Sequence, residues 1–311
     1  MTAPEAARAA GMRAALIPFA LLVVLGAMWG LSISLGKIAT TAGVHPLALV
    51  LWQAGLGACI VLGFCAVRGR LGRLSPRHLP YYIGCSLLSV VIPSSAVYAA
   101  APHIPAGVLA ILVTAAPMVT YVLALGMRLE RLSLVRAAGI MLGFAAVLMI
   151  VGPRASLPAP GMAGWVLVAM VAPVCYGFVN VFIARYRPEN SDSIALAAGM
   201  LATAALIVAP VALLSGATHM IGPPWDAVDM AVLGLPVITG IAHILMFELI
   251  RMSGPVFFSQ VGYLITAAGV LWGMAIFGER HSPWIWAALV LMFAGLALVN
   301  LRQRAPSRPL G

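Results

Sequence analysis

The sequence predicts an all-α integral membrane protein, with ten transmembrane helices forming two five-helix repeats of inverted topology. Three observations support this fold class: an apolar composition, ten apolar runs of membrane-spanning length, and a weak internal repeat. Hydrophobic residues make up 63% of the 311 residues and charged residues only 8%, whereas a soluble domain carries roughly 25% charged residues. So few charges cannot cover a surface that faces water, and we therefore expect most of the surface to face lipid.

Ten apolar runs have the length needed to cross a bilayer. The hydrocarbon core of a bilayer is roughly 30 Å thick, and a helix rises about 1.5 Å per residue, so about 20 residues span it. A chain in lipid must satisfy its own backbone hydrogen bonds, so each run is expected to be a helix. The first run is too long for the apolar part of a signal peptide, and nine more runs follow it. The predicted helices are residues 14–38, 46–67, 79–99, 105–127, 134–152, 161–184, 193–215, 228–250, 255–277 and 283–301.

The basic residues predict the orientation, because cytoplasmic loops of membrane proteins carry an excess of lysine and arginine. If the N-terminus is cytoplasmic, all but three of the 18 basic residues fall on the inner side. The three outer ones are Lys37, Arg154 and Arg280. Both termini are therefore predicted to face the cytoplasm.

The net charge of +10 does not indicate a nucleic-acid partner, since the basic residues lie in short clusters between apolar runs. The cysteines also lie within apolar runs and form no CxxC pair. They are predicted to be small buried hydrophobic residues. The sequence predicts no cofactor and no metal site.

An internal repeat relates the two halves of the chain. Residues 105–152 align without gaps onto residues 254–301, at an offset of 149 residues, and the alignment pairs Glu130 with Glu279. The first helix of each half aligns at an offset of 147 residues, which places Trp29 over Tyr176. The identities are sparse, so the register is a hypothesis that a structure can test.

The repeat also predicts topology. Five is an odd number of helices, so the second copy enters the membrane upside down relative to the first. The predicted units are residues 1–152 and residues 153–311, which together form one membrane domain. Inverted repeats are a recurrent transporter architecture, with a substrate site near the midplane where the repeats meet.

Several sequence features carry a resemblance to a known family. They are the WG-x6-K start (Trp29, Gly30, Lys37), the small-residue, proline-containing fourth helix (Ala106–Pro117), and the glutamates that open the last helix of each half (Glu130, Glu279). With these features the chain resembles the drug/metabolite transporter superfamily, in particular its ten-helix members built from two EamA-type repeats. Within that superfamily it is most similar to bacterial amino-acid exporters. It departs from the pattern at Gln53, where an arginine is common, and at Thr266, where a proline is expected.

The resemblance implies a multi-pass protein of the bacterial plasma (inner) membrane that exports small molecules and is not an enzyme. It favours neutral or zwitterionic metabolites, such as aromatic or other neutral amino acids, moved by alternating access through a central cavity. Its partners would be the substrate and the lipid bilayer, with no nucleic acid, and the protein would be a monomer or a weak homodimer.

The placement of acidic residues bears on ion coupling, because a charge at the bilayer centre costs about 2.5–3.5 kcal/mol on insertion scales. No Asp or Glu lies in the middle of a predicted helix. This distribution favours a facilitator or exchanger over an ion-driven pump. A proton-coupled drug or metabolite exporter that uses His243, the one mid-helix titratable base, stays open as the second hypothesis. A membrane enzyme is a remote third, because the sequence lacks a cluster of histidines and carboxylates.

Polar and aromatic residues within the predicted helices are the candidates for substrate binding. Tyr176 and Asn180 lie four residues apart and so share one helical face. The alternative role of such residues is to hold helices together by hydrogen bonds, and for His243 the alternative is a neutral ring bonded to a backbone carbonyl. The full candidate set is Trp29, Ser86, Ser94, Tyr98, Thr114, Tyr121, Tyr176, Asn180, Thr239, His243, Gln260 and Tyr263.

Overall fold

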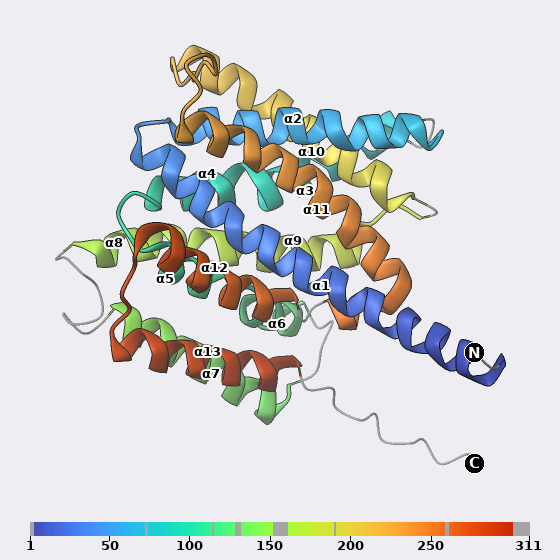
Figure 1. Ribbon diagram of the computed structural model, residues 1–311. Coiled ribbons are helices and arrows are strands. Elements are labelled where there is room, and N and C mark those ends of the chain that lie inside the picture. The colour runs from blue at the N-terminus through green and yellow to red at the C-terminus, as the bar shows by residue number, and fades with distance from the viewer. Residues whose placement is uncertain are drawn as a thin grey trace.

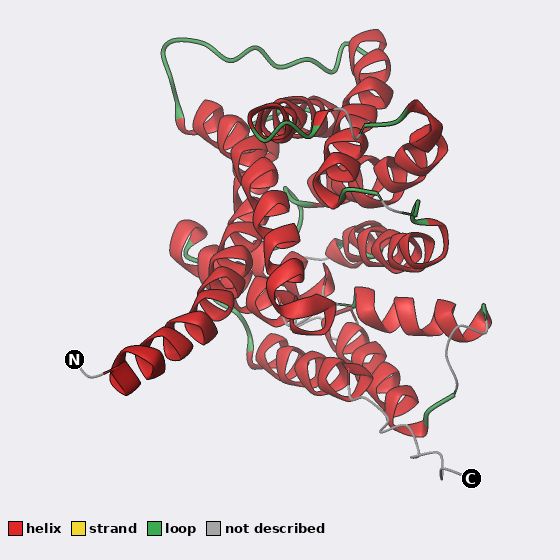
Figure 2. Ribbon diagram, turned by 90° about the vertical axis from the view of Figure 1, so that its right-hand side faces the viewer, coloured by secondary structure: helices red, strands yellow, loops and turns green. Residues whose placement is uncertain are grey.

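The structure, a computed structural model, describes residues 3–71, 74–113, 115–127, 132–151, 161–189, 191–258 and 261–300. This part of the chain consists of helices and connecting loops and contains no strand, as Figure 2 shows. The prediction of an all-helical fold is confirmed. The helices follow one another as α1 (Ala3–Thr41), α2 (Pro46–Val67), η2 (Pro76–His78), α3 (Leu79–Ser86), η3 (Leu87–Val91), α4 (Ile92–Ala100), α5 (Ala106–Val113), α6 (Ala116–Gly126), α7 (Leu134–Val151), α8 (Met162–Ala169), α9 (Val171–Tyr186), α10 (Ser193–Leu214), α11 (Ala227–Phe258), α12 (Val261–Phe277) and α13 (Pro283–Asn300).

Among the described residues, seven helical stretches are long and apolar enough to cross a membrane. Three shorter apolar helices occupy the other predicted ranges, at Leu134–Met149, Val261–Phe277 and Pro283–Gly295. The chain is therefore a multi-pass membrane protein. Ten crossings and cytoplasmic termini stay predictions.

Several predicted helices are interrupted where proline or a local change of winding occurs. The range 79–99 contains a π-helical turn, η3, which Pro93 follows in the first turn of α4. The range 161–184 is broken at Met170, and Pro173 lies in the first turn of α9. Proline lacks a backbone N–H and clashes with the carbonyl four residues earlier, and neighbouring turns adjust to restore the lost bonds.

The predicted boundary between the eighth and ninth helices is wrong. A helix end was expected at residue 250 and a new start at 255, but α11 continues to Phe258 and α12 begins at Val261. Glu248 therefore lies ten residues before the end of α11, and the expectation that no carboxylate lies in the middle of a helix does not hold there. The Gly254-Pro255 pair suggested a break, yet membrane helices tolerate such residues when surrounding helices satisfy the freed backbone groups.

The helices pack in groups that are visible in Figure 1. Helices α2, α10 and α11 lie together at one edge of the bundle, and α7 packs along α13 at the opposite edge. Between these edges α1 packs against α12, and α6 packs against α9. This peripheral pair corresponds to the predicted ranges 134–152 and 283–301, the last helix of each half.

Two glycine contacts confirm the register of the internal repeat. A Cβ added at Gly30 would lie 2.8 Å from the Cβ of Ala268, and one added at Gly177 would lie 2.5 Å from Cγ1 of Val119. Gly30 and Gly177 are 147 residues apart, and Val119 and Ala268 are 149 apart, so the two close approaches are repeat mates. Glycine is required at both positions because the neighbouring helix comes too near for a side chain.

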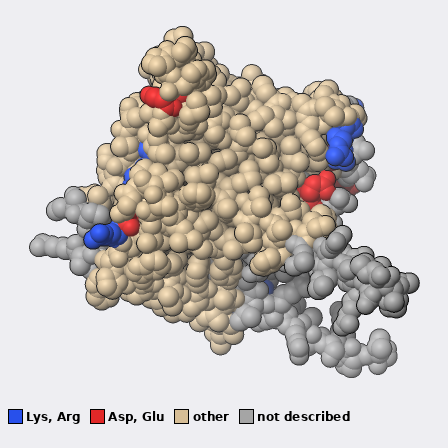
Figure 3. Space-filling view, in the orientation of Figure 1, with Lys and Arg blue, Asp and Glu red and all other residues tan. Residues whose placement is uncertain are grey.

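The surface agrees with a membrane setting. In the face that Figure 3 shows, the described charged side chains lie toward the edges, and a broad band without them lies between. A lipid-facing band of this kind needs no charged residues, which accounts for the low charged fraction of the chain.

Candidate functional site

A chain of hydrogen bonds joins three helices in the interior. The Tyr98 hydroxyl on α4 donates to Oε1 of Gln53 on α2 at 2.6 Å. Nε2 of the same amide donates to Oγ1 of Thr239 on α11 at 3.1 Å. Tyr98 and Gln53 belong to the first repeat and Thr239 to the second, so the bonds cross between the repeats.

His243 and Trp29 continue this cluster. His243 Nδ1 lies 2.7 Å from the backbone carbonyl of Thr239, and a carbonyl can only accept, so Nδ1 carries the proton. The Trp29 and His243 rings meet edge to face, with centroids 6.1 Å apart and an angle of 79° between planes. We call Trp29, Gln53, Tyr98, Thr239 and His243 the central polar chain.

Small residues make room for the central polar chain. A Cβ added at Gly36 on α1 would lie 2.5 Å from Cε1 of Tyr98. A side chain at Gly36 would therefore push the tyrosine away from Gln53. Tyr98 and Thr239 are only 5% and 4% exposed, so their hydroxyls are held out of contact with lipid.

The chemistry of this cluster is neutral and aromatic. A phenol, an amide and a hydroxyl can exchange their mutual bonds for bonds to a polar ligand. An indole and a phenol can also hold an ammonium group over their faces. The arrangement suits a small polar molecule that carries no net charge.

Two further predicted residues lie beside the central polar chain. Ser94 is buried on α4, one turn before Tyr98. Helix α4 packs on α9, which carries Tyr176 as a partly buried residue. The structure therefore brings together a subset of the predicted residues from both repeats.

Asn180 lies apart from this group. Its Nδ2 donates to Oγ1 of Thr120 on α6 at 3.1 Å, and the side chain is exposed. This bond is of the helix-joining type that the sequence left open as the alternative role.

Three other candidates lie in helix packing contacts. The Ser86 hydroxyl donates to the carbonyls of Tyr82 and Met200, and so ties α3 to α10. The Tyr121 hydroxyl accepts from the backbone N–H of Ser133, just before α7. Tyr263 on α12 packs on the ring of Phe293 at 5.5 Å. Two more predicted residues, Thr114 and Gln260, lie outside the described residues.

Gln53 was not among the predicted site residues, although it is the centre of the observed hydrogen bonds. A signal was present in the sequence, because Gln53 is the one amide in the otherwise apolar range 46–67 and departs from the arginine common in the family. A lone amide in a membrane helix must find partners inside the protein.

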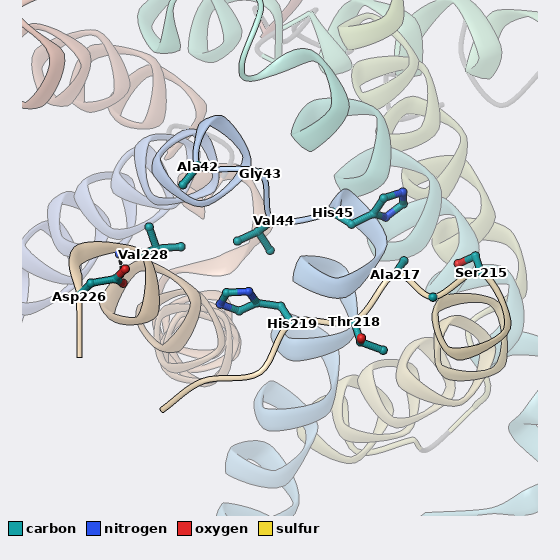
Figure 4. Close-up of a pocket in the computed structure, with 11 residues that line it drawn as sticks. Ala42, Gly43, Val44, His45, Ser215, Ala217, Thr218, His219, Asp226 and Val228 are labelled. Atoms are coloured by element: carbon teal, nitrogen blue, oxygen red, sulfur yellow. Dashed lines mark hydrogen bonds between the residues drawn. The ribbon is translucent and has the colours of Figure 1, made fainter. Parts of the chain in front are cut away.

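A pocket with a volume of about 480 Å³ lies at one end of the molecule, where the α1–α2 connection meets the α10–α11 connection. Figure 4 shows His219 reaching between Val44 and the start of α11. Nε2 of His219 lies 3.5 Å from a carboxylate oxygen of Asp229, and its backbone carbonyl accepts from Nε1 of Trp52 at 3.0 Å. The pocket thus lies at the ends of α2 and α11, the helices that carry Gln53 and Thr239.

Three features define a multi-pass membrane protein of the transporter type. They are the two repeats with matching helix contacts, the apolar surface, and the uncharged polar cluster between the repeats. The family model of the EamA-like transporter family matches residues 16–152 and 163–301, and the chain belongs to that family. Membership shows that it is a membrane transporter of small molecules.

Among solved structures, one described only as "Crystal structure of protein" covers 92% of this chain and 96% of its own, with a TM-score of 0.61. It is 19% identical in sequence, and the likeness shows the shared fold alone. The comparison with curated proteins finds no match.

Proposed function

We propose that this transporter exports small neutral or zwitterionic metabolites, with amino acids, aromatic or other neutral, as its substrates. It would reside in the plasma (inner) membrane of a bacterium and work by alternating access as a facilitator or exchanger. The observation that carries the proposal is the bond series from Tyr98 through Gln53 to Thr239, because it crosses the two repeats with neutral groups only.

The central polar chain supports the substrate class by its chemistry. A substrate with a net charge would need a compensating charge in the site, since an unpaired charge in a low-dielectric interior is costly. A zwitterion carries its own compensation, and its ammonium group can lie against Trp29 or Tyr98. A neutral amino acid therefore matches both the polarity and the aromatic content of the site.

The bonding of His243 is compatible with a transporter without proton coupling. The Nδ1–H donated to the Thr239 carbonyl is present in both the neutral ring and the imidazolium, so His243 makes this bond whether or not Nε2 is protonated. A proton carrier would need to release and rebind a proton in every cycle, and nothing in this bond depends on a second proton.

Counterflow in proteoliposomes tests the proposal. Vesicles loaded with unlabelled neutral amino acid should take up the labelled compound from outside, with no gradient of protons or sodium. A panel of anionic, cationic and neutral amino acids defines the substrate class. Accumulation of substrate against its own gradient, driven by an imposed proton or sodium gradient, would show that the exchanger mechanism is wrong and would favour coupling through His243.

A further inference from the structure

A second polar cluster lies near the C-terminal end of α1, around Lys37. Nζ of Lys37 lies 3.0 Å from Oε1 of Glu279 and donates to the backbone carbonyl of Ile104 at 3.0 Å. The ammonium also lies 5.0 Å from the centroid of the Phe277 ring. Lys37 comes from the first repeat and Glu279 from the second, so this ion pair joins the two halves of the protein.

The Glu279 carboxylate also holds the start of α5. Oε1 accepts from the backbone N–H of Ala106 at 2.6 Å, and Oε2 accepts from that of Gly107 at 3.0 Å. The first N–H groups of a helix have no partner inside the helix and carry partial positive charge. One carboxylate therefore satisfies two unpaired amides and one ammonium.

His281 closes the remaining side of the carboxylate. Its side chain is 1% exposed, and its Nε2 lies 3.6 Å from Oε2 of Glu279 with no hydrogen-bond partner among the described residues. A Cβ added at Gly107 would lie 2.6 Å from that nitrogen. The imidazole thus presses on the first turn of α5. We call Lys37, Ala106, Gly107, Glu279 and His281 the α5 junction.

Helices α5 and α12 pack closely next to the α5 junction. A Cβ added at Gly269 on α12 would lie 2.4 Å from the Cβ of Ala110 on α5. One added at Gly273 would lie 2.6 Å from Oε2 of Glu279. Because α1 packs against the same helix at Gly30, the ends of α1, α5 and α12 are drawn together with little space between them.

We propose that the α5 junction is the gate at this end of the transport path, the end predicted to face outward, and that Lys37 and Glu279 are the residues that hold it shut. This inference rests on the proposed alternating-access function, in which the two repeats move against each other around a central site. Opening this end separates Lys37 from Glu279 and frees the start of α5. Both charges lie near helix ends, where entering water hydrates them as they part.

The gate has a quantitative consequence for the populations of the two states. Contacts made only in the closed state shift the equilibrium toward that state by the amount of their free energy. Loss of the ion pair should therefore raise the population open at this end by about tenfold, within the usual 5- to 150-fold range of such couplings.

Cysteine labelling measures that population without any substrate. The four native cysteines are replaced by serine, and Val108→Cys on α5, which is 0% exposed beneath the junction, becomes the reporter. A membrane-impermeant maleimide is applied to intact cells and, separately, to inverted vesicles. Lys37→Gln and Glu279→Gln should each raise the labelling rate from the outer side about tenfold, and Lys37→Arg should leave it within about twofold of the parent.

The matched control is Arg70→Gln. Arg70 pairs with Asp192 at 3.3 Å, and this carboxylate caps the start of α10 in the same way. The pair also joins the two repeats but lies at the other end of the molecule, so its loss should not raise outer labelling. If Glu279→Gln does not fold, as judged by its size-exclusion profile, Lys37→Gln decides the question. An unchanged rate in folded Lys37→Gln, or an equal rise in Arg70→Gln, would overturn the gate, whatever the outcome of the transport assays.

Discussion

The central polar chain and the α5 junction both join the two repeats, yet the first consists of neutral groups and the second of full charges. Hydrogen bonds join Tyr98, Gln53 and Thr239 in the interior, whereas Lys37 and Glu279 form an ion pair near helix ends. A buried charge is costly at the bilayer centre and is tolerated where a helix start and nearby water compensate it. Under the two proposals above, the difference corresponds to a division of tasks, with neutral contacts to substrate at the centre and a charged contact that controls access.

The largest expected effect is on stability at the α5 junction. Glu279→Ala removes the carboxylate that pairs with Lys37 and accepts from two backbone N–H groups. The partly buried ammonium of Lys37 is then left without a counter-charge. Breaking such a pair costs about 3–5 kcal/mol when it is well buried, and we expect the lower end because the two side chains are 15% and 9% exposed. Thermal unfolding of the detergent-solubilised protein measures the loss. A melting temperature equal to that of the parent would show that the charged contacts of the α5 junction do not contribute more to stability than the neutral contacts of the central polar chain.

The next effect is on transport at the central polar chain. Gln53→Leu preserves the volume but leaves the Tyr98 hydroxyl without its acceptor and Thr239 without its donor. Loss of a buried polar contact to the substrate costs about 1–3 kcal/mol, so the apparent affinity for amino acid in counterflow should fall by about 5- to 150-fold. Trp284→Ala, at the exposed start of α13, is the control and should affect insertion or stability more than substrate recognition. A fall in transport in the control variant alone would show that Gln53 is only a packing residue.

A smaller effect is expected from Tyr98→Phe, which removes one hydrogen bond and keeps the ring. The loss should be about 1 kcal/mol, or roughly fivefold in apparent affinity. Because the ring and its packing on Gly36 stay in place, expression should not change, and the melting temperature should fall only by the loss of this one bond. If the affinity is unchanged as well, the Tyr98 hydroxyl only joins α4 to α2 and does not bind the substrate.

The smallest effect concerns pH at the α5 junction. Burial lowers the pKa of His281 below its ordinary value near 6.5, Glu279 raises it in part, and Lys37 lowers it further. The folded state therefore binds a proton less readily than the unfolded state, so stability is lost as the pH falls below about 6.5. His281→Asn should flatten the decline in melting temperature between about pH 7 and pH 5. The control is His103→Asn, which changes an exposed histidine and should leave the decline as it is.

Much of the architecture was predictable because it follows from the solvent. Apolar runs near 20 residues must form helices in lipid, and the structure has helices over every predicted range that it describes. The repeat register was predictable as well, since the same offsets relate the Gly30 and Gly177 contacts. The exact positions of the helix breaks near Met170 and Ala115, each a few residues before a proline, were not predictable, because they depend on how neighbouring helices satisfy freed backbone groups.

The sequence by itself determined the class of molecule and its repeats, because composition and spacing reflect the bilayer directly. Only the tertiary structure decided which polar residues meet. Gln53 and Thr239 are 186 residues apart in the chain, and Lys37 and Glu279 are 242 apart. The same kind of polar group can bond to its own helix, as Thr203 does with Gly199, or to a distant one, as Gln53 does with Thr239. Local sequence does not distinguish these outcomes, since the choice depends on which helix faces which across the interface between the repeats.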